Sequence, residues 1–139
     1  MLVYNVVEFT ATISLGGEMR ILVVDDEPSV LDLFKSYLGG LKGYEVAIAC
    51  NAAEGLEVFR SFKPDKVFSD WNMPGGGGSA LIIGMTAEDF DLQNVAVVTG
   101  YGVSDEDALA NINQALQLQI GAAFLKPLNL RLILEFVQK

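Results

Sequence analysis

The sequence predicts an α/β fold in which a doubly wound parallel sheet of five strands is covered on both faces by helices. Short apolar runs rich in β-branched residues recur along the chain, segments with helical spacing separate them, and each run ends in polar or glycine-rich residues. Strands that alternate with helices form parallel sheets because each crossover helix packs back onto the sheet. The five predicted strands are 21–24, 46–49, 67–68, 95–98 and 122–125.

The segments between these runs carry apolar residues at helical spacing. Ser104 followed by Asp107 resembles a capping box, and Asn129 is suited to cap the last helix. Gly84 and the run Gly75–Gly78 weaken the third helix, so we expect a flexible connection before it, with a linker as the alternative. The predicted helices lie near 30–41, 52–59, 79–89, 109–116 and 130–137.

The composition limits the functions open to the chain. Its 139 residues are 51% hydrophobic, which is enough for one domain with a buried core. The net charge of −9 argues against direct nucleic acid binding, because phosphates would be repelled. The chain has no histidine, which excludes Ser/His/Asp catalysis, Cys/His catalysis and most zinc sites and leaves carboxylate chemistry.

The cysteine content and the hydropathy pattern favour a cytoplasmic protein. Cys50 is the single cysteine, cannot form an internal disulfide, and is expected to be buried because it lies in an apolar run. The sequence has neither a secretory signal pattern nor an apolar stretch of about 18 residues, so we expect no membrane association.

Residues 1–18 stand outside the alternation of strands and helices. Apolar and polar residues alternate over 7–15, which is typical of an extra strand. Alternatively, the codons of 16–18 would form a purine-rich stretch ahead of Met19, as at a bacterial ribosome-binding site. We therefore hypothesise a natural start at Met19, an N-terminal extension before it, and one domain over 19–139.

Polar side chains fall at the predicted strand ends: Asp25 and Asp26 after the first strand, Asp70 after the third, Thr99 after the fourth and Lys126 after the fifth. The carboxyl ends of parallel strands share one edge, where ligands gather. Three carboxylates there would repel one another unless a cation lay among them, and both Mg²⁺ and Lys126 meet that need. An aspartate is also a competent nucleophile for phosphoryl transfer. Each residue alone has a plainer explanation as a helix-terminal charge, a turn residue or a strand end, but the combination favours a functional site.

Four motifs carry these residues: 21–28 (ILVVDDEP), 70–75 (DWNMPG), 97–100 (VVTG) and 124–127 (FLKP). With these motifs, the stretch 20–137 resembles the receiver domains of two-component signalling. The resemblance implies a flavodoxin-like fold with strand order 2-1-3-4-5. It also implies a phosphoacceptor signalling domain that promotes its own phosphorylation and dephosphorylation, rather than an enzyme with an external substrate.

The same resemblance implies a metal site and a phosphoacceptor. Asp70 would accept the phosphoryl group. Asp25 and Asp26 would hold Mg²⁺ together with Asp70 and the backbone carbonyl of Asn72, one of the two aspartates binding through water.

Further roles and partners follow from the resemblance. Lys126 would pair with one phosphate oxygen, and Thr99 would hydrogen-bond to another. The phosphoryl donor would be a phosphohistidine of a histidine kinase or a histidine phosphotransfer protein, consistent with a chain that has no histidine of its own. The bond between Lys126 and Pro127 is expected to be cis by the same analogy.

One departure from the receiver pattern concerns the switch residues. The family usually has an aromatic residue three positions before this lysine, where the sequence has Ala123, while Phe124 lies two positions before it. Conventional coupling of Thr99 to an aromatic side chain is therefore open. The candidates are Phe124 and Tyr101, and the plainer explanation of Tyr101 is an exposed loop residue.

By resemblance, the output surface comprises the fourth helix, the strand 122–125 and the last helix. Apolar residues of 130–137 cover an arc of roughly 200°, wider than the roughly 100° that one core contact needs. We expect this surface to contact a second copy, an output domain or residues 1–18. The chain is either a stand-alone receiver or a piece of a larger regulator or hybrid kinase.

Three rival functions share parts of the pattern. A Mg²⁺-dependent aspartyl phosphatase would need a second acid two residues after Asp70, where Asn72 stands. A flavin-binding domain would need a serine- and threonine-rich loop after the first strand, where 25–27 would repel phosphate. A degenerate receiver that only binds proteins would lack some of the key polar groups, and all of them are present here.

Deletion of residues 1–18 tests the hypothesis of an extension. A chain that starts at Met19 should fold and take up a phosphoryl group as the full chain does, measured by circular dichroism and by the mass of the intact phosphorylated protein. Loss of either property would show that the segment belongs to the working protein.

Overall fold

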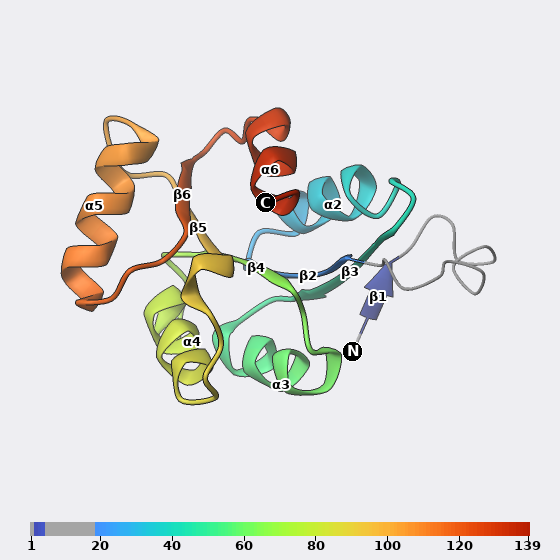
Figure 1. Ribbon diagram of the computed structural model, residues 1–139, viewed down its shortest axis with the longest axis horizontal. Coiled ribbons are helices and arrows are strands. Elements are labelled where there is room, and N and C mark those ends of the chain that lie inside the picture. Colours follow the sequence, from blue (N-terminus) through green and yellow to red (C-terminus); the bar gives the residue numbers. More distant parts are fainter. Residues whose placement is uncertain (1, 5–18) are drawn as a thin grey trace.

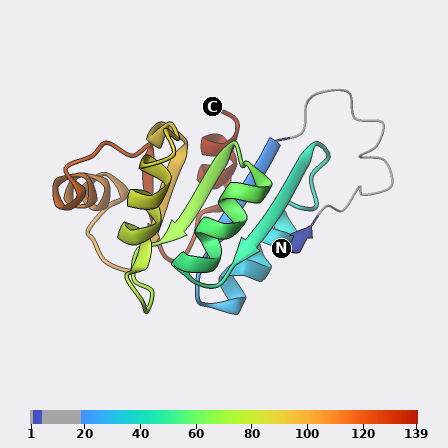
Figure 2. The ribbon, with the colours of Figure 1, turned by 90° about the horizontal axis from the view of Figure 1, so that it is seen from below.

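The computed structural model describes residues 2–4 and 19–139. Its strands are β1 (Leu2–Tyr4), β2 (Met19–Val24), β3 (Tyr44–Ala49), β4 (Lys66–Asp70), β5 (Val95–Thr99) and β6 (Ala122–Leu125). They form one sheet in the order β1-β3-β2-β4-β5-β6, and Figure 2 shows β3 and β4 running in the same direction. All five predicted strands form, and their order is the expected 2-1-3-4-5.

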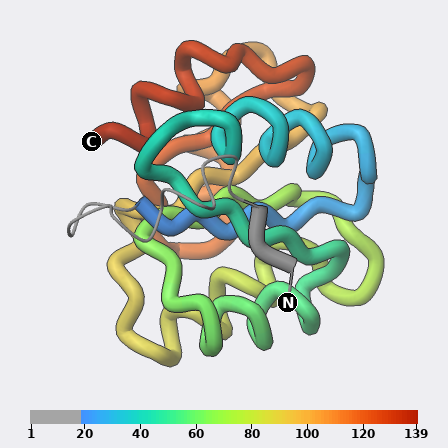
Figure 3. The backbone as a smooth tube through the Cα atoms, turned by 90° about the vertical axis from the view of Figure 1, so that its right-hand side faces the viewer, coloured from blue at the N-terminus to red at the C-terminus, as the bar shows by residue number. Residues whose placement is uncertain are grey.

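The helices of the described residues are α2 (Pro28–Tyr37), α3 (Ala52–Phe62), α4 (Gly77–Thr86), α5 (Asp105–Leu116) and α6 (Leu130–Val137). A 3₁₀ turn, η1 (Leu92–Asn94), precedes β5. Side chains of α2 and α6 pack on one face of the sheet, and those of α3, α4 and α5 pack on the other. Figures 1 and 3 show α2 and α3 on opposite sides of the strands. The sheet is therefore doubly wound, as the sequence predicts.

Both predicted helix caps are confirmed. The Ser104 hydroxyl oxygen accepts a hydrogen bond from the backbone N–H of Asp107 (3.1 Å). The Asn129 side chain accepts from the backbone N–H groups of Arg131 (3.1 Å) and Leu132 (3.3 Å). Each cap supplies an acceptor for N–H groups that the first turn of a helix leaves without a partner.

Buried residues occupy both faces of the parallel strands. Along β2, Leu22 and Val24 face α3 and α4, whereas Ile21 and Val23 face α2 and α6. All four side chains are almost completely shielded from solvent. Because both faces are covered, the strands appear in the sequence as continuous apolar runs rather than alternating ones. The two packed faces fix the strand ends relative to one another.

Phe68 of β4 is the centre of an aromatic cluster on the α2 and α6 face. Its ring centroid lies 4.9 Å from that of Phe34, 5.5 Å from that of Phe136 and 6.4 Å from that of Phe124. Tilted and edge-to-face pairs of this kind contribute about 1 kcal/mol each beyond the area they bury. The cluster therefore joins α2, β4, β6 and α6 two residues before the end of β4.

The glycine run is part of the packed structure, and the prediction of a flexible connection across it is wrong for Gly77 and Gly78. Helix α4 begins at Gly77, two residues before the predicted start, and both glycines are buried. A Cβ at Gly77 would lie 2.6 Å from the carbonyl oxygen of Trp71, and one at Gly78 would lie 2.6 Å from that of Asp70. The missing side chains let the helix approach the end of β4 closely.

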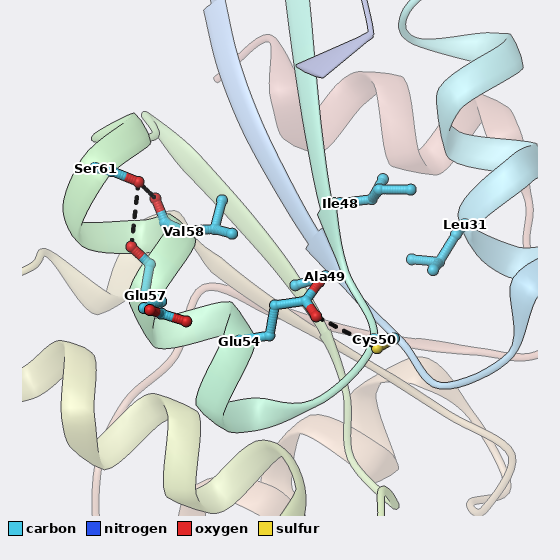
Figure 4. A pocket seen from close by; sticks show the side chains of 8 residues that line it. All are labelled: Leu31, Ile48, Ala49, Cys50, Glu54, Glu57, Val58 and Ser61. Atoms are coloured by element: carbon cyan, nitrogen blue, oxygen red, sulfur yellow. Dashed lines mark hydrogen bonds between the residues drawn. The ribbon is translucent and has the colours of Figure 1, made fainter. Parts of the chain in front are cut away.

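Cys50 is exposed, so the prediction of a buried thiol is wrong. Strand β3 ends at Ala49, and the next residue leaves the core. The Cys50 thiol donates a hydrogen bond to the Glu54 carboxylate (3.6 Å), as Figure 4 shows. Both residues line an open pocket of about 620 Å³ between α2, the end of β3 and α3, which includes none of the predicted site residues.

The N-terminal segment contributes one short strand. β1 pairs antiparallel with β3, with Leu2 opposite Ile48 and Tyr4 opposite Val46. The strand predicted over 7–15 lies outside the described residues. No helix in the described ranges combines the length and the apolar character that crossing a membrane requires.

The close packing of α4 on β4 predicts that Gly78→Ala destabilises the domain. The added methyl group would meet the Asp70 carbonyl oxygen, so the helix would have to shift. We expect the free energy of unfolding to fall by about 2 kcal/mol, measured by urea denaturation. Gly100→Ala is the matched control, because a Cβ there meets nothing within 4 Å and should change stability by less than about 0.5 kcal/mol. Equal stability of the two variants would contradict the packing argument.

Candidate functional site

The carboxyl ends of β2 and β4 bring three carboxylates together. Asp25 and Asp26 follow β2, and Asp70 is the last residue of β4. One oxygen of each lies within 4.8 Å of the others, a spacing that suits a shared metal ion. Asp25 is 1% exposed and Asp70 5%, whereas Asp26 is exposed. Two of the three charges are thus removed from water.

Lys126 approaches this acidic cluster from the end of β6. Its ammonium nitrogen lies 2.7 Å from Oε1 of Glu27, 3.3 Å from Oδ2 of Asp25 and 3.7 Å from Oδ1 of Asp70. The peptide bond between Lys126 and Pro127 is cis, as predicted. The single ammonium faces more negative charge than it can balance.

Burial and mutual repulsion disfavour the ionised state of the cluster. Burial raises the pKa of Asp70 to about 6, and the charge of Asp25 adds to the rise, while Lys126 and the backbone N–H of Asn72 act in the opposite direction. Burial also raises the pKa of Asp25, against the lowering effect of the hydrogen bond from the backbone N–H of Glu27. The site therefore gains from any further positive charge placed among the carboxylates.

Lys126 keeps its charge in this environment. Burial lowers its pKa, but the hydrogen bond to Glu27 and the charges of Asp25 and Asp70 outweigh this effect, so that the pKa is raised overall. The residue is a permanent cation at the site.

The acidic cluster fits a hard divalent cation. Carboxylate oxygens are the ligands that Mg²⁺ prefers, and it commonly uses only one or two protein carboxylates. The buried Oδ2 of Asp25 accepts no hydrogen bond, although the Lys126 ammonium lies nearby. A buried carboxylate oxygen without a hydrogen bond is costly, and a metal ion would satisfy it. Asn72, whose carbonyl is a predicted ligand, is exposed in the loop after β4.

Thr99 ends β5 beside the acidic cluster and is 2% exposed. Its hydroxyl oxygen accepts a hydrogen bond from the backbone N–H of Tyr101 (3.2 Å). A cavity of about 200 Å³ is lined by Thr99, Trp71, Tyr101 and the inner face of α5. The Tyr101 residue itself is 75% exposed.

Phe124 lies on the other face of the sheet from this cavity. It packs in the aromatic cluster with Phe68 and Phe136. Ala123, at the position where receivers usually carry the aromatic residue, is buried on the face that packs against α5. The structure thus brings Thr99 and Tyr101 together and keeps Phe124 apart from both.

Glu27 is a site residue that sequence reasoning missed. A carboxylate just before Pro28 is suited by its charge to the start of a helix, yet the Glu27 side chain makes no capping hydrogen bond and instead accepts one from Lys126. The two residues are 99 positions apart, so no local pattern in the sequence signals the pair.

A family model described as the response regulator receiver domain matches residues 21–138. The chain belongs to this family. Receiver domains are signalling domains of two-component systems, and the recognition made from the four motifs is confirmed.

Curated relatives of the receiver domain include both short and long proteins. Sporulation initiation phosphotransferase F of Bacillus subtilis is 28% identical over 120 residues, which cover 86% of this chain and 91% of that protein. Chemotaxis protein CheY of Pseudomonas aeruginosa is 28% identical over 121 residues, 87% of this chain and 94% of that protein. Transcriptional regulatory protein PrrA of Mycobacterium tuberculosis is 35% identical over 89 residues, which cover 64% of this chain but only 38% of that protein.

Solved structures agree with the fold of the receiver domain. A CheY-like receiver domain protein from Methanospirillum hungatei JF-1 is 32% identical, with a TM-score of 0.64 over 87% of this chain and 91% of that one. Chemotaxis protein CheY4 of Vibrio cholerae has a TM-score of 0.72 at 22% identity, over 87% of this chain and 97% of that one. The second likeness supports the fold alone.

The raised pKa of Asp70 predicts that, without divalent cations, the receiver domain loses stability as the pH rises from about 4 to about 6. In this window folded Asp70 keeps its proton, whereas the unfolded chain releases it near 3.8, so the folded state binds more protons and rising pH favours unfolding. An asparagine side chain has no proton to release, so the Asp70→Asn variant should not show this loss. We expect its free energy of unfolding, relative to that of the unmodified protein, to increase by about 2 kcal/mol as the pH rises from about 4 to about 7, measured by urea denaturation. A stability difference that stays constant with pH would contradict this account.

Proposed function

We propose that this receiver domain accepts a phosphoryl group on Asp70 from a phosphohistidine of a histidine kinase or a histidine phosphotransfer protein. The observation that carries the proposal is that buried Asp70 lies with Asp25, Asp26 and the Lys126 ammonium at one edge of the sheet. The domain promotes its own phosphorylation and dephosphorylation and is not an enzyme with an external substrate. Partners of this kind place it in the cytoplasm.

The transfer needs an ionised nucleophile. An oxygen of the Asp70 carboxylate attacks phosphorus, the P–N bond of the donor breaks, and its electron pair returns to the imidazole nitrogen. In hydrolysis, a water attacks the phosphorus, which restores the carboxylate and releases inorganic phosphate. A neighbouring cation favours the first step because it keeps Asp70 ionised despite its raised pKa, and it favours hydrolysis because it stabilises the carboxylate that leaves.

The remaining groups neutralise charge on the phosphoryl oxygens. Asp25 and Asp26, with Asp70 and the carbonyl of Asn72, would hold Mg²⁺, which when bound offsets negative charge at the reacting phosphoryl group. Lys126 pairs with a phosphoryl oxygen, as a fixed cation does in other phosphoryl-transfer sites.

Thr99 and Tyr101 form the switch in this proposal. The Thr99 hydroxyl donates to a phosphoryl oxygen and, as it moves, draws along the Tyr101 backbone N–H that is bonded to it. Phosphorylation then favours one of two conformations of the loop after β5. Tyr101 is a better aromatic candidate than Phe124, because it shares a cavity with Thr99 while Phe124 packs on the opposite face.

The output surface in this proposal comprises α5, β6 and α6, which together line a groove of about 240 Å³. It would contact a second copy or an output domain. Ile133, Phe136 and Val137 of α6 are buried, while Leu132 and Leu134 are partly buried against the core, so the apolar arc of α6 is only partly available. The relative PrrA is a transcriptional regulatory protein of which this chain spans 38%, and for this chain we propose no direct nucleic acid binding.

Trp71, next to Asp70, reports phosphorylation through its fluorescence. Adding Mg²⁺ and then acetyl phosphate should change the signal in two steps, and the second should coincide with a gain of one phosphoryl mass in the intact protein. Asp70→Asn should keep the fold and slow the second step at least about 100-fold, because the nucleophile is lost.

Two outcomes would contradict this proposal. A fluorescence response to Mg²⁺ without covalent phosphate would indicate a degenerate receiver that binds proteins only. Sustained hydrolysis of an external phosphoester that depends on Asp70 would indicate a phosphatase.

A further inference from the structure

Lys126 is held most closely by a carboxylate that lies outside the acidic cluster. Its ammonium nitrogen is 2.7 Å from Glu27, which is the distance of a strong charged hydrogen bond, and 3.7 Å from Asp70, which is beyond hydrogen-bond range. The cation that should neutralise a phosphoryl group thus forms its shortest contact with Glu27 and only a longer ion pair with the phosphoacceptor.

Glu27 is also the partner of Lys126 that is easiest to displace. Its side chain is 55% exposed, so its carboxylate is hydrated when it leaves the ammonium. The side chain of Asp25 is 2% exposed and accepts a hydrogen bond from the backbone N–H of Glu27, so it is fixed and has no access to water. Separating the buried pair costs more than separating the exposed one.

We propose that Glu27 is a positioning residue that holds Lys126 back from Asp70 until a phosphoryl oxygen replaces it as the partner of the ammonium. The inference rests on the proposed function, because the competing oxygen belongs to phosphorylated Asp70. No covalent bond is made or broken in this exchange of ion pairs. Competition for one ammonium then sets how readily the receiver domain is phosphorylated.

Substitutions at Glu27 separate this role from a simple effect of charge. Glu27→Gln removes the charge, and Glu27→Asp keeps it on a side chain one methylene shorter, which no longer spans the 2.7 Å contact. Glu57→Gln is the control, since it makes the same change of net charge on the exposed surface of α3. Rates of phosphorylation by acetyl phosphate and the apparent Kd for beryllofluoride, an unreactive analogue of the phosphoryl group, are followed by Trp71 fluorescence with saturating Mg²⁺.

Both Glu27 variants should be phosphorylated about three- to tenfold faster than the unmodified protein and should bind beryllofluoride more tightly by a similar factor. Glu57→Gln should match the unmodified protein. A merely structural role for Glu27 predicts losses and not gains, and thermal melts of each variant check the fold.

Several results would overturn the inference. If Glu27→Asp matches the unmodified protein while Glu27→Gln is faster, the effect is repulsion of the anionic donor and not the hold on Lys126. Unchanged or slower phosphorylation of both variants also contradicts it. If the unmodified protein itself takes up no phosphoryl group, the proposed function fails first, which distinguishes the two failures.

Discussion

Repulsion among carboxylates at one edge of the sheet is the constraint on which the site depends. Asp25 and Asp70 are buried side by side, and Asp26 lies against them at the surface. Bringing like charges together in a poorly solvated place is unfavourable unless cations join them. Lys126 supplies one positive charge for several negative ones, so the folded domain is prepared for a second cation.

The rest of the fold keeps these charges from moving apart. The strands that carry the aspartates are packed on both faces, and the aromatic cluster around Phe68 lies directly beneath the end of β4. On the other face, Gly77 and Gly78 let α4 lie against the backbone of Asp70 and Trp71. The apolar core thus keeps the three carboxylates close together although their charges repel one another.

The sequence predicts this fold well because the apolar runs that form the strands and the polar residues that end them can both be read locally. Apolar runs with polar ends specify the strands, and the rule that parallel strands share a carboxyl edge brings Asp25, Asp70 and Lys126 together before any coordinates are known. The errors arise where the decisive contact is not local. Composition cannot tell a flexible glycine run from one packed on a carbonyl oxygen. The predicted strand ends at Ala49, as β3 does, but the apolar run does not show that the chain leaves the core at Cys50. The pairing of Glu27 with Lys126 spans 99 positions and leaves no periodic trace.

The two edges of the sheet have a consequence for how copies of this protein meet. On one side, β1 occupies the hydrogen-bonding edge of β3 from Val46 to Ile48. On the other, the outward N–H of Leu125 in β6 is already bonded to the Asp105 carboxylate (2.9 Å). Backbone groups at the margins of a sheet otherwise invite a strand from a neighbouring molecule and promote aggregation. The chain thus supplies its own partners for the edge of β3 and for the N–H of Leu125, so neither is open to a strand from another molecule, and the outermost strand on the first side is only the three-residue β1.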